Sequence, residues 1–166
     1  GIWERPEKAP DGYEHPMGEV DGALQEAMDT FDVWRVYIDP GSSAGNIEPL
    51  VEKWQGFYGE EKVLRWAMNR PKQTANSVAS YVDAVATGEV SHNGDDRFAR
   101  HIENATKRKV TAKDDNGNPM YVLAKEAHDS PLKIDAAAAA VLSWEARGDA
   151  IAEGAEKTPA STVYFT

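Results

Sequence analysis

The sequence FDVWRVYIDPG at residues 31–41 decides the fold class. Its β-branched and aromatic run at 33–38 stops at the breakers Asp39, Pro40 and Gly41, which predicts a buried strand. Apolar residues at helical spacing predict amphipathic helices on either side of this strand, over about 19–31 and 47–57. Strands that alternate with helices indicate an α/β fold with a partly parallel sheet.

The remainder of the chain continues this pattern. It predicts a strand over 62–68, helices over 78–85 and 98–105, a hairpin of strands 108–113 and 120–125, and a last helix from 131 to about 153. The hairpin loop contains Asn116-Gly117, a pair that favours positive φ angles. Ser130 is predicted to cap the last helix, with Pro131 at its first position.

The chain has 166 residues, a length typical of one domain, and 41% of them are hydrophobic, which favours a globular protein over a disordered one. It contains no Cys, which excludes disulfides and thiolate metal sites. No apolar run reaches the ~20 residues that span a bilayer. The P-loop motif of nucleotide hydrolases is also absent.

The net charge of −10 is unevenly distributed. Residues 1–60 hold 13 acidic and 4 basic residues, whereas the segments 62–72 and 97–113 are basic. These two segments are either ordinary solvated surface or local binding sites for a polyanion. If the polyanion is a DNA substrate, they should flank the face that carries the catalytic groups.

Two aspartates occupy positions that need a physical explanation. Asp39 follows a buried strand at its C-terminal end, where α/β sheets place ligand sites, although Asp-Pro-Gly is also common turn chemistry. Asp135 interrupts the apolar arc of the last helix, and burying an unpaired carboxylate is costly. A salt bridge to Lys133 or Lys125 would satisfy it, and so would Mg²⁺ or Mn²⁺, which prefer oxygen ligands. Both explanations stay open at this point.

Several stretches together resemble the C-terminal nuclease domain of phage terminase large subunits, especially those of phages that infect actinobacteria. They are GIWERP at 1–6, FDVWRVYIDP at 31–40, WQGFYG at 54–59, VSHNGDDRFARHIENA at 90–105 and AKEAHDSPLKIDAAAAAVLSWEA at 124–146. The resemblance implies a ribonuclease-H-like α/β fold, with a mixed sheet and flanking helices, over residues 1–154 and a C-terminal tail over 155–166.

The resemblance also implies a metal-dependent endonuclease that cuts concatemeric double-stranded DNA during genome packaging by two-metal phosphodiester hydrolysis. Asp39 of YIDP matches the family's middle catalytic acid and Asp135 of KIDA its last, so both are expected to bind Mg²⁺ or Mn²⁺. Other matched positions, without an assigned role, are His92, His101 and Asn104. The expected contacts to the DNA backbone are Lys125, Arg97, Arg100, Lys107, Arg108 and Lys109.

Further expectations follow from the same resemblance. The partners would be phage DNA, portal protein, the small terminase subunit and an N-terminal ATPase domain of the full-length protein, in the cytoplasm of the bacterial host and without a membrane. The family's first catalytic aspartate lies on a strand before the equivalent of GIWERP, so the domain is expected to be N-terminally incomplete. Some relatives carry a histidine where Leu132 stands here. The alternative is a non-catalytic packaging module or prophage remnant that docks on portal or DNA without cutting.

Overall fold

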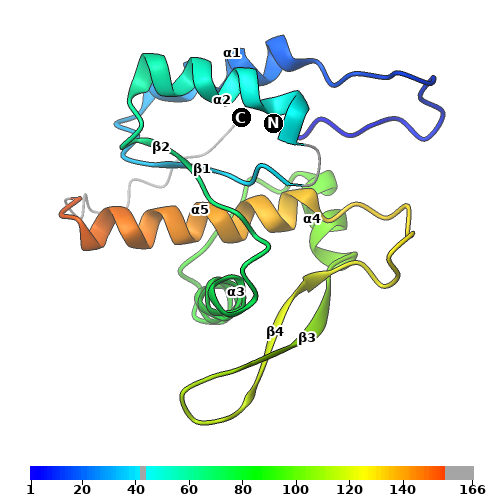
Figure 1. The fold of residues 1–166 in the computed structure, drawn as a ribbon, viewed down its shortest axis with the longest axis vertical. Coiled ribbons are helices and arrows are strands. Elements are labelled where there is room, and N and C mark those ends of the chain that lie inside the picture. Colours follow the sequence, from blue (N-terminus) through cyan, green and yellow to red (C-terminus); the bar gives the residue numbers. More distant parts are fainter. Residues whose placement is uncertain (42–43, 156–166) are drawn as a thin grey trace.

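A computed structural model of the chain describes residues 1–41 and 44–155, and these form five helices and four strands (Figure 1). In chain order the elements are α1 (Met17–Thr30), β1 (Val36–Ile38), α2 (Ala44–Tyr58), β2 (Val63–Arg65), α3 (Pro71–Ala86), α4 (Asp96–Glu103), β3 (Thr106–Lys113), β4 (Pro119–Ala124) and α5 (Asp135–Ala152). The predicted order of helices and strands is confirmed, and the fold is mixed α/β.

The strands form two separate two-stranded sheets within the described residues. β1 and β2 are parallel, with Val36 opposite Val63, as the alternation of strands and helices predicts. β3 and β4 form the predicted antiparallel hairpin, whose loop contains Gly117 at φ +83°. The two pairs do not join into the single mixed sheet expected of a ribonuclease-H-like fold, because the hairpin packs on α3 instead of on β1.

The β1 strand is shorter than the predicted strand over 33–38. Its ladder is limited by its partner, since β2 has three residues and Lys62 still belongs to the turn that follows α2. Upstream of β1, the Val33 N–H donates to the Phe31 carbonyl at 2.9 Å, which curls the chain before the strand begins. The other edge of β1 has no strand partner among the described residues.

The elements are arranged in layers around α5, which crosses the middle of the molecule in Figure 1. α1, α2 and the β1–β2 pair lie on one side of it, and α3 and the hairpin lie on the other. The core of the first side contains the buried residues Ile38, Val51, Trp54 and Val63. On the second side, Val78 and Tyr81 of α3 pack against Val141 of α5.

α5 begins four residues later than predicted, which corrects the assignment of Ser130 as its cap. The carbonyls that a longer helix would use are occupied by side chains: Lys125 Nζ donates to the Ser130 carbonyl and Asn104 Nδ2 to the Lys133 carbonyl, both at 3.0 Å. The Ser130 hydroxyl accepts from the Leu132 N–H at 3.3 Å. Residues 131–134 therefore form an irregular segment, and Asp135 becomes the first residue of the helix.

Other helix limits agree with the sequence. α2 and α3 are followed by Gly59 and Gly88, both with positive φ, and Asp95 caps α4 by accepting from the Arg97 N–H at 2.8 Å. None of the helices in residues 1–41 and 44–155 combines the length and hydrophobicity of a membrane-spanning segment. The expected C-terminal tail, 155–166, lies outside the described residues except for Ala155.

Candidate functional site

An open cavity of about 1860 Å³ lies between α1, β1 and one face of α5. Its walls are largely apolar and include Val36 and Ile38 of β1 and Leu142 of α5. Asp39 and Asp135 both line it, although they are 96 residues apart in sequence. The structure therefore brings the two predicted catalytic aspartates to one cavity, where the end of β1 approaches the start of α5 (Figure 1).

The Asp39 carboxylate already has hydrogen-bond donors. Its Oδ1 accepts from the Gly41 N–H at 3.2 Å and from the Met68 N–H at 3.3 Å. These bonds fix the turn after β1 and connect it to the segment after β2, which is the turn chemistry that Asp-Pro-Gly also predicts. Both bonds use the same oxygen, and the side chain is exposed to the cavity.

Asp135 is exposed, which corrects the expectation that it interrupts a buried apolar arc. It belongs to the first turn of α5, where a negative charge interacts favourably with the helix dipole, so no partner is needed to offset burial. Among the described residues neither Lys133 nor Lys125 forms a salt bridge with it, and Lys125 binds the Ser130 carbonyl instead.

Asp39 and Asp135 would supply only part of the predicted divalent-metal site. Two carboxylates that face one cavity are suitable oxygen donors for Mg²⁺ or Mn²⁺. No group of three or more His, Cys, Asp or Glu side chains within residues 1–41 and 44–155 is placed to hold a metal ion. A complete site would need further donors from outside this set.

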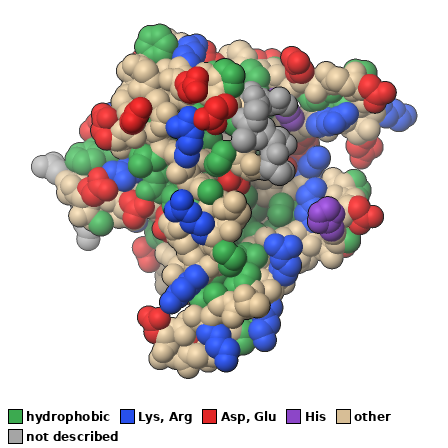
Figure 2. Space-filling model, in the orientation of Figure 1, with side chains coloured by type: hydrophobic (Ala, Val, Ile, Leu, Met, Phe, Trp, Pro, Cys, Tyr) green, Lys and Arg blue, Asp and Glu red, His purple; other side chains and the backbone are tan. Residues whose placement is uncertain are grey.

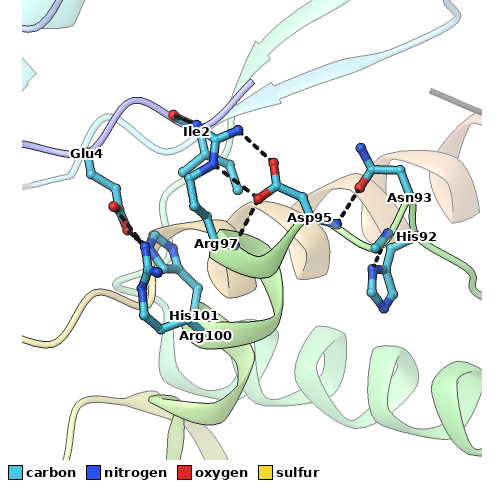
Figure 3. Close-up of polar contacts among 9 residues, drawn as sticks. Ile2, Glu4, His92, Asn93, Asp95, Arg97, Arg100 and His101 are labelled. Carbon is cyan, nitrogen blue, oxygen red and sulfur yellow. Dashed lines mark hydrogen bonds and ion pairs between the residues drawn. The ribbon is translucent and has the colours of Figure 1, made fainter. Parts of the chain in front are cut away.

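His101 connects three segments next to Asp135. The side chain is 1% exposed, its Nε2 lies 2.6 Å from Glu4 Oε1, and its Nδ1 accepts from the Ala136 N–H at 3.0 Å. Because Nδ1 accepts a hydrogen bond, the neutral ring carries its proton on Nε2 and donates it to Glu4. Figure 3 shows Glu4 reaching from the N-terminal segment to His101 and Arg100 of α4.

Glu4 is the residue beside His101 and Arg100 that the sequence did not indicate as important. Both of its oxygens accept from Arg100 Nη2 at 2.9 Å, and hydrogen bonds from Arg100 and then from His101 lower its pKa below 4.5. The available signal was GIWERP itself, an acidic residue beside a Trp in a Pro-rich segment. Trp3 donates to Glu19 of α1 at 2.9 Å, so this segment is anchored at two adjacent residues.

The other two matched positions are also structural in their contacts. Asn104 holds the Lys133 carbonyl, two residues before Asp135. His92 is exposed, its Nδ1 accepts from the Gly94 N–H at 3.1 Å, and its ring lies 5.1 Å from that of Phe98. His101 and Asn104 therefore fix the start of α5, whereas His92 shapes the loop before α4.

Several predicted DNA contacts are occupied within the protein. Arg97 pairs with Asp95, and its hydrogen bonds lower the pKa of Asp95 to about 2 (Figure 3). Arg97 also donates to the Ile2 carbonyl. Arg100 pairs with Glu4. Lys107, Arg108 and Lys109 lie exposed on β3. The cations of segments 62–72 and 97–113 are not among the residues that line the cavity.

Comparisons with known proteins place the chain beside phage proteins. Two proteins named "Gene 13 protein", from Mycobacterium phage D29 and Mycobacterium phage L5, are each 32% identical to it over 157 residues. The match covers 89% of this chain but 24% of each relative, so the chain spans about a quarter of their length. No protein-family model matches the chain, and no solved structure gives a significant match. The similarity to these two proteins supports a phage origin.

Proposed function

We propose that the chain is the nuclease domain of a phage terminase large subunit and that it cleaves concatemeric double-stranded DNA during genome packaging. One observation carries the proposal: Asp39 and Asp135, which match two catalytic acids of that family, come from separate elements and line one cavity. Similarity to mycobacteriophage proteins along most of the chain supports it.

In this proposal Asp39 and Asp135 contribute oxygen ligands for Mg²⁺ or Mn²⁺. Two such ions, when bound, supply the activation of a water molecule and the stabilisation of the leaving oxygen. The remaining ligands would come from a strand of the longer protein. Two observations support such a strand: among the described residues, one edge of β1 has no strand partner, and the buried Arg35 Nε has no hydrogen-bond partner.

The wider setting is part of the same proposal. A terminase of this kind would act in the host cytoplasm, with an ATPase domain in the same polypeptide, and would work with portal protein and the small terminase subunit. The fourfold greater length of the two relatives leaves room for such a domain.

The test is a plasmid-nicking assay of the longer protein that supplies the remaining ligands, with Mn²⁺ or Mg²⁺ and with EDTA as the blank. We expect metal-dependent nicking that falls at least about 100-fold in Asp39→Asn and in Asp135→Asn, about the loss caused by removing one transition-state contact. Asp11→Asn, an exposed acid outside the cavity, is the matched control and should cut like the unmodified chain. Calorimetric titration should show weaker Mn²⁺ binding by Asp39→Asn and Asp135→Asn and unchanged Mn²⁺ binding by Asp11→Asn.

A non-catalytic packaging module is the second candidate, and the contacts of Asp39 favour it. Its Oδ1 is engaged by two backbone N–H groups, and the described residues place no third acid or histidine beside the pair. For such a module we expect DNA or portal binding without cutting in any metal, and Mn²⁺ binding that is unchanged by Asp135→Asn. That combination of results would replace the nuclease proposal.

A further inference from the structure

The hairpin of β3 and β4 carries four cations in a protein with a net charge of −10. Lys107, Arg108, Lys109 and Lys113 are all exposed, and none of them belongs to a salt bridge among the described residues. Arg35, Lys53 and Arg65, by contrast, each have a carboxylate partner. Other described cations without a salt bridge, such as Lys8 and Lys62, are scattered along the chain, whereas the hairpin brings four together within seven residues.

The acids of the hairpin do not neutralise these cations. Asp114 is used by the loop, where its Oδ1 accepts from the Asn116 N–H at 2.9 Å and the Asn118 N–H at 2.7 Å. Asp115 is 97% exposed and lies 3.5 Å from Lys72 of α3. Both acids are at the tip, whereas Lys107 and Lys109 are near the base of the hairpin.

The two faces of the hairpin differ in chemistry. One face packs on α3, with Met120 and Val122 buried against Ala75. Lys109 lies opposite Tyr121 in the ladder, so their side chains share the other face. There Lys107 Nζ lies 5.2 Å from the centre of the Tyr121 ring, which is 37% exposed. The hairpin thus presents lysines around an exposed aromatic ring.

The arrangement of this surface fits a polyanion of regular shape. Figure 2 shows Lys and Arg side chains gathered over the hairpin, while Asp and Glu are more frequent over α1 and α2. A two-stranded ribbon has the width that the major groove of DNA admits, and lysines on a strand contact phosphates without reading sequence. Lysines also protect sheet edges from aggregation, and that role requires no ligand.

We propose that the β3–β4 hairpin is a binding arm for double-stranded DNA, which it holds by its phosphates through Lys107, Lys109 and the neighbouring cations. The proposal deepens the proposed function, on which its choice of DNA rests, because it assigns substrate holding to an element outside the cavity. The acidic half of the molecule repels DNA, so the arm sets the orientation in which a duplex approaches.

The experiment measures duplex binding by fluorescence anisotropy in EDTA, so that cleavage plays no part. Lys107→Gln/Lys109→Gln is compared with Lys8→Gln/Lys53→Gln, which removes the same charge from outside both basic segments. We expect the hairpin variant to bind at least 10-fold more weakly at low salt. We also expect the slope of log affinity against log salt to fall by about 1 for each lysine removed. The control variant should keep the slope of the unmodified chain.

Thermal unfolding of both variants checks that the fold is intact, and exposed Lys→Gln changes should leave it so. Equal losses in the two variants would overturn the proposal, because they would reflect net charge alone. So would absence of duplex binding by the unmodified chain, or tighter binding to double-stranded RNA of the same length.

Plasmid nicking in Mn²⁺ by the longer protein separates this proposal from the nuclease proposal. A longer protein that binds DNA through the hairpin and never cuts contradicts the nuclease and supports the arm. Cutting, together with a duplex affinity that is unchanged in Lys107→Gln/Lys109→Gln, contradicts the arm and supports the nuclease.

Discussion

At the scale of single residues, His101 shows how a polar group can be buried without loss of stability. Both ring nitrogens have partners, Glu4 on one side and the Ala136 N–H on the other, so burial leaves nothing unsatisfied. The Ala136 N–H is one of the donors that the first turn of a helix leaves free. His101 therefore acts as a cap for α5 from another element, next to Asp135.

Replacing His101 separates these two contacts. His101→Ala should lower the free energy of unfolding by about 3 kcal/mol, because it leaves a buried N–H unpaired and removes a bond to a charged group. His101→Asn keeps an acceptor for the Ala136 N–H, and His101→Gln keeps a donor for Glu4, so each should lose less. Urea unfolding at neutral pH measures all three.

The control for these variants is His128→Ala, at an exposed histidine in the segment before α5. It should change the free energy of unfolding by less than about 0.5 kcal/mol. If His101→Ala proves as mild as this control, or if Asn and Gln are no better than Ala, the two contacts do not stabilise the start of α5.

At the scale of elements, α3 corrects the prediction, made from helical spacing, that Val78, Tyr81, Val82 and Val85 form one apolar stripe. Val78 and Tyr81 are buried at 7% and 9% exposure, whereas Val82 and Val85 are exposed at 56% and 53%. Val78 packs against Val141 of α5, and Val82 does not belong to the buried core. The same residue type on the same helix thus has two environments.

Val78→Ala and Val82→Ala make a matched pair. The first should lower the free energy of unfolding by about 2 kcal/mol, because two buried carbon atoms are removed and a cavity is left. The second should stay within about 0.5 kcal/mol. Thermal or urea unfolding measures both, and equal losses would mean that α3 does not pack on α5 through Val78.

Elements with strong local signals could be predicted from the sequence, and those set by long-range contacts could not. The helix over 47–57 and the Asn116-Gly117 hairpin are local, and both are confirmed, although Phe57 at the end of that helix is 75% exposed. The predicted start of α5 is wrong because two side chains take carbonyls that a longer helix would need: Lys125 takes that of Ser130, and Asn104 takes that of Lys133, 29 residues away. Glu4 was missed for the same reason, since its importance comes from a partner 97 residues away.

In the predicted site, too, local features could be predicted from the sequence and long-range ones could not. Asp39 was identifiable because a strand and its breakers are local, whereas the cavity that it shares with Asp135 is a product of the fold. The exposure of Asp135 could not be read from helical periodicity, because that argument assumed a helix that begins before it.

At the scale of the whole molecule, hydrogen bonds and ion pairs connect the layers on the two sides of the wide cavity between β1 and α5. At one end Glu4 and His101 hold the start of α5. At the other end, Tyr37 of β1 donates to Asp149 in the last turns of α5. Arg35, just before β1, pairs with Glu153, just after α5. Apolar side chains line the space between these polar contacts, so the two layers are connected at the ends of α5 more than along its middle.

Tyr37 provides a direct measure of this connection. Burial, and then its bond to the Asp149 carboxylate, raise its pKa from 10.0 to about 12. Because the folded pKa lies above that of the unfolded chain, the stabilisation by this pair is fully present below pH 10.0 and is lost as the pH rises through about 12. Tyr37→Phe should lower the free energy of unfolding by about 2 kcal/mol at neutral pH, as expected for a hydrogen bond to a charged group.

Tyrosinate absorbance, recorded for the unmodified chain and for Tyr37→Phe, isolates this group by difference. The difference should titrate near pH 12 while circular dichroism shows a folded chain, and near pH 10 in urea, where tyrosine has its ordinary pKa. A difference that titrates near pH 10 in the folded chain would show that Tyr37 is not held against α5. The layer of β1 would then be free to separate from α5 at that end, and the cavity that contains Asp39 and Asp135 would change shape with it, because both layers form its walls.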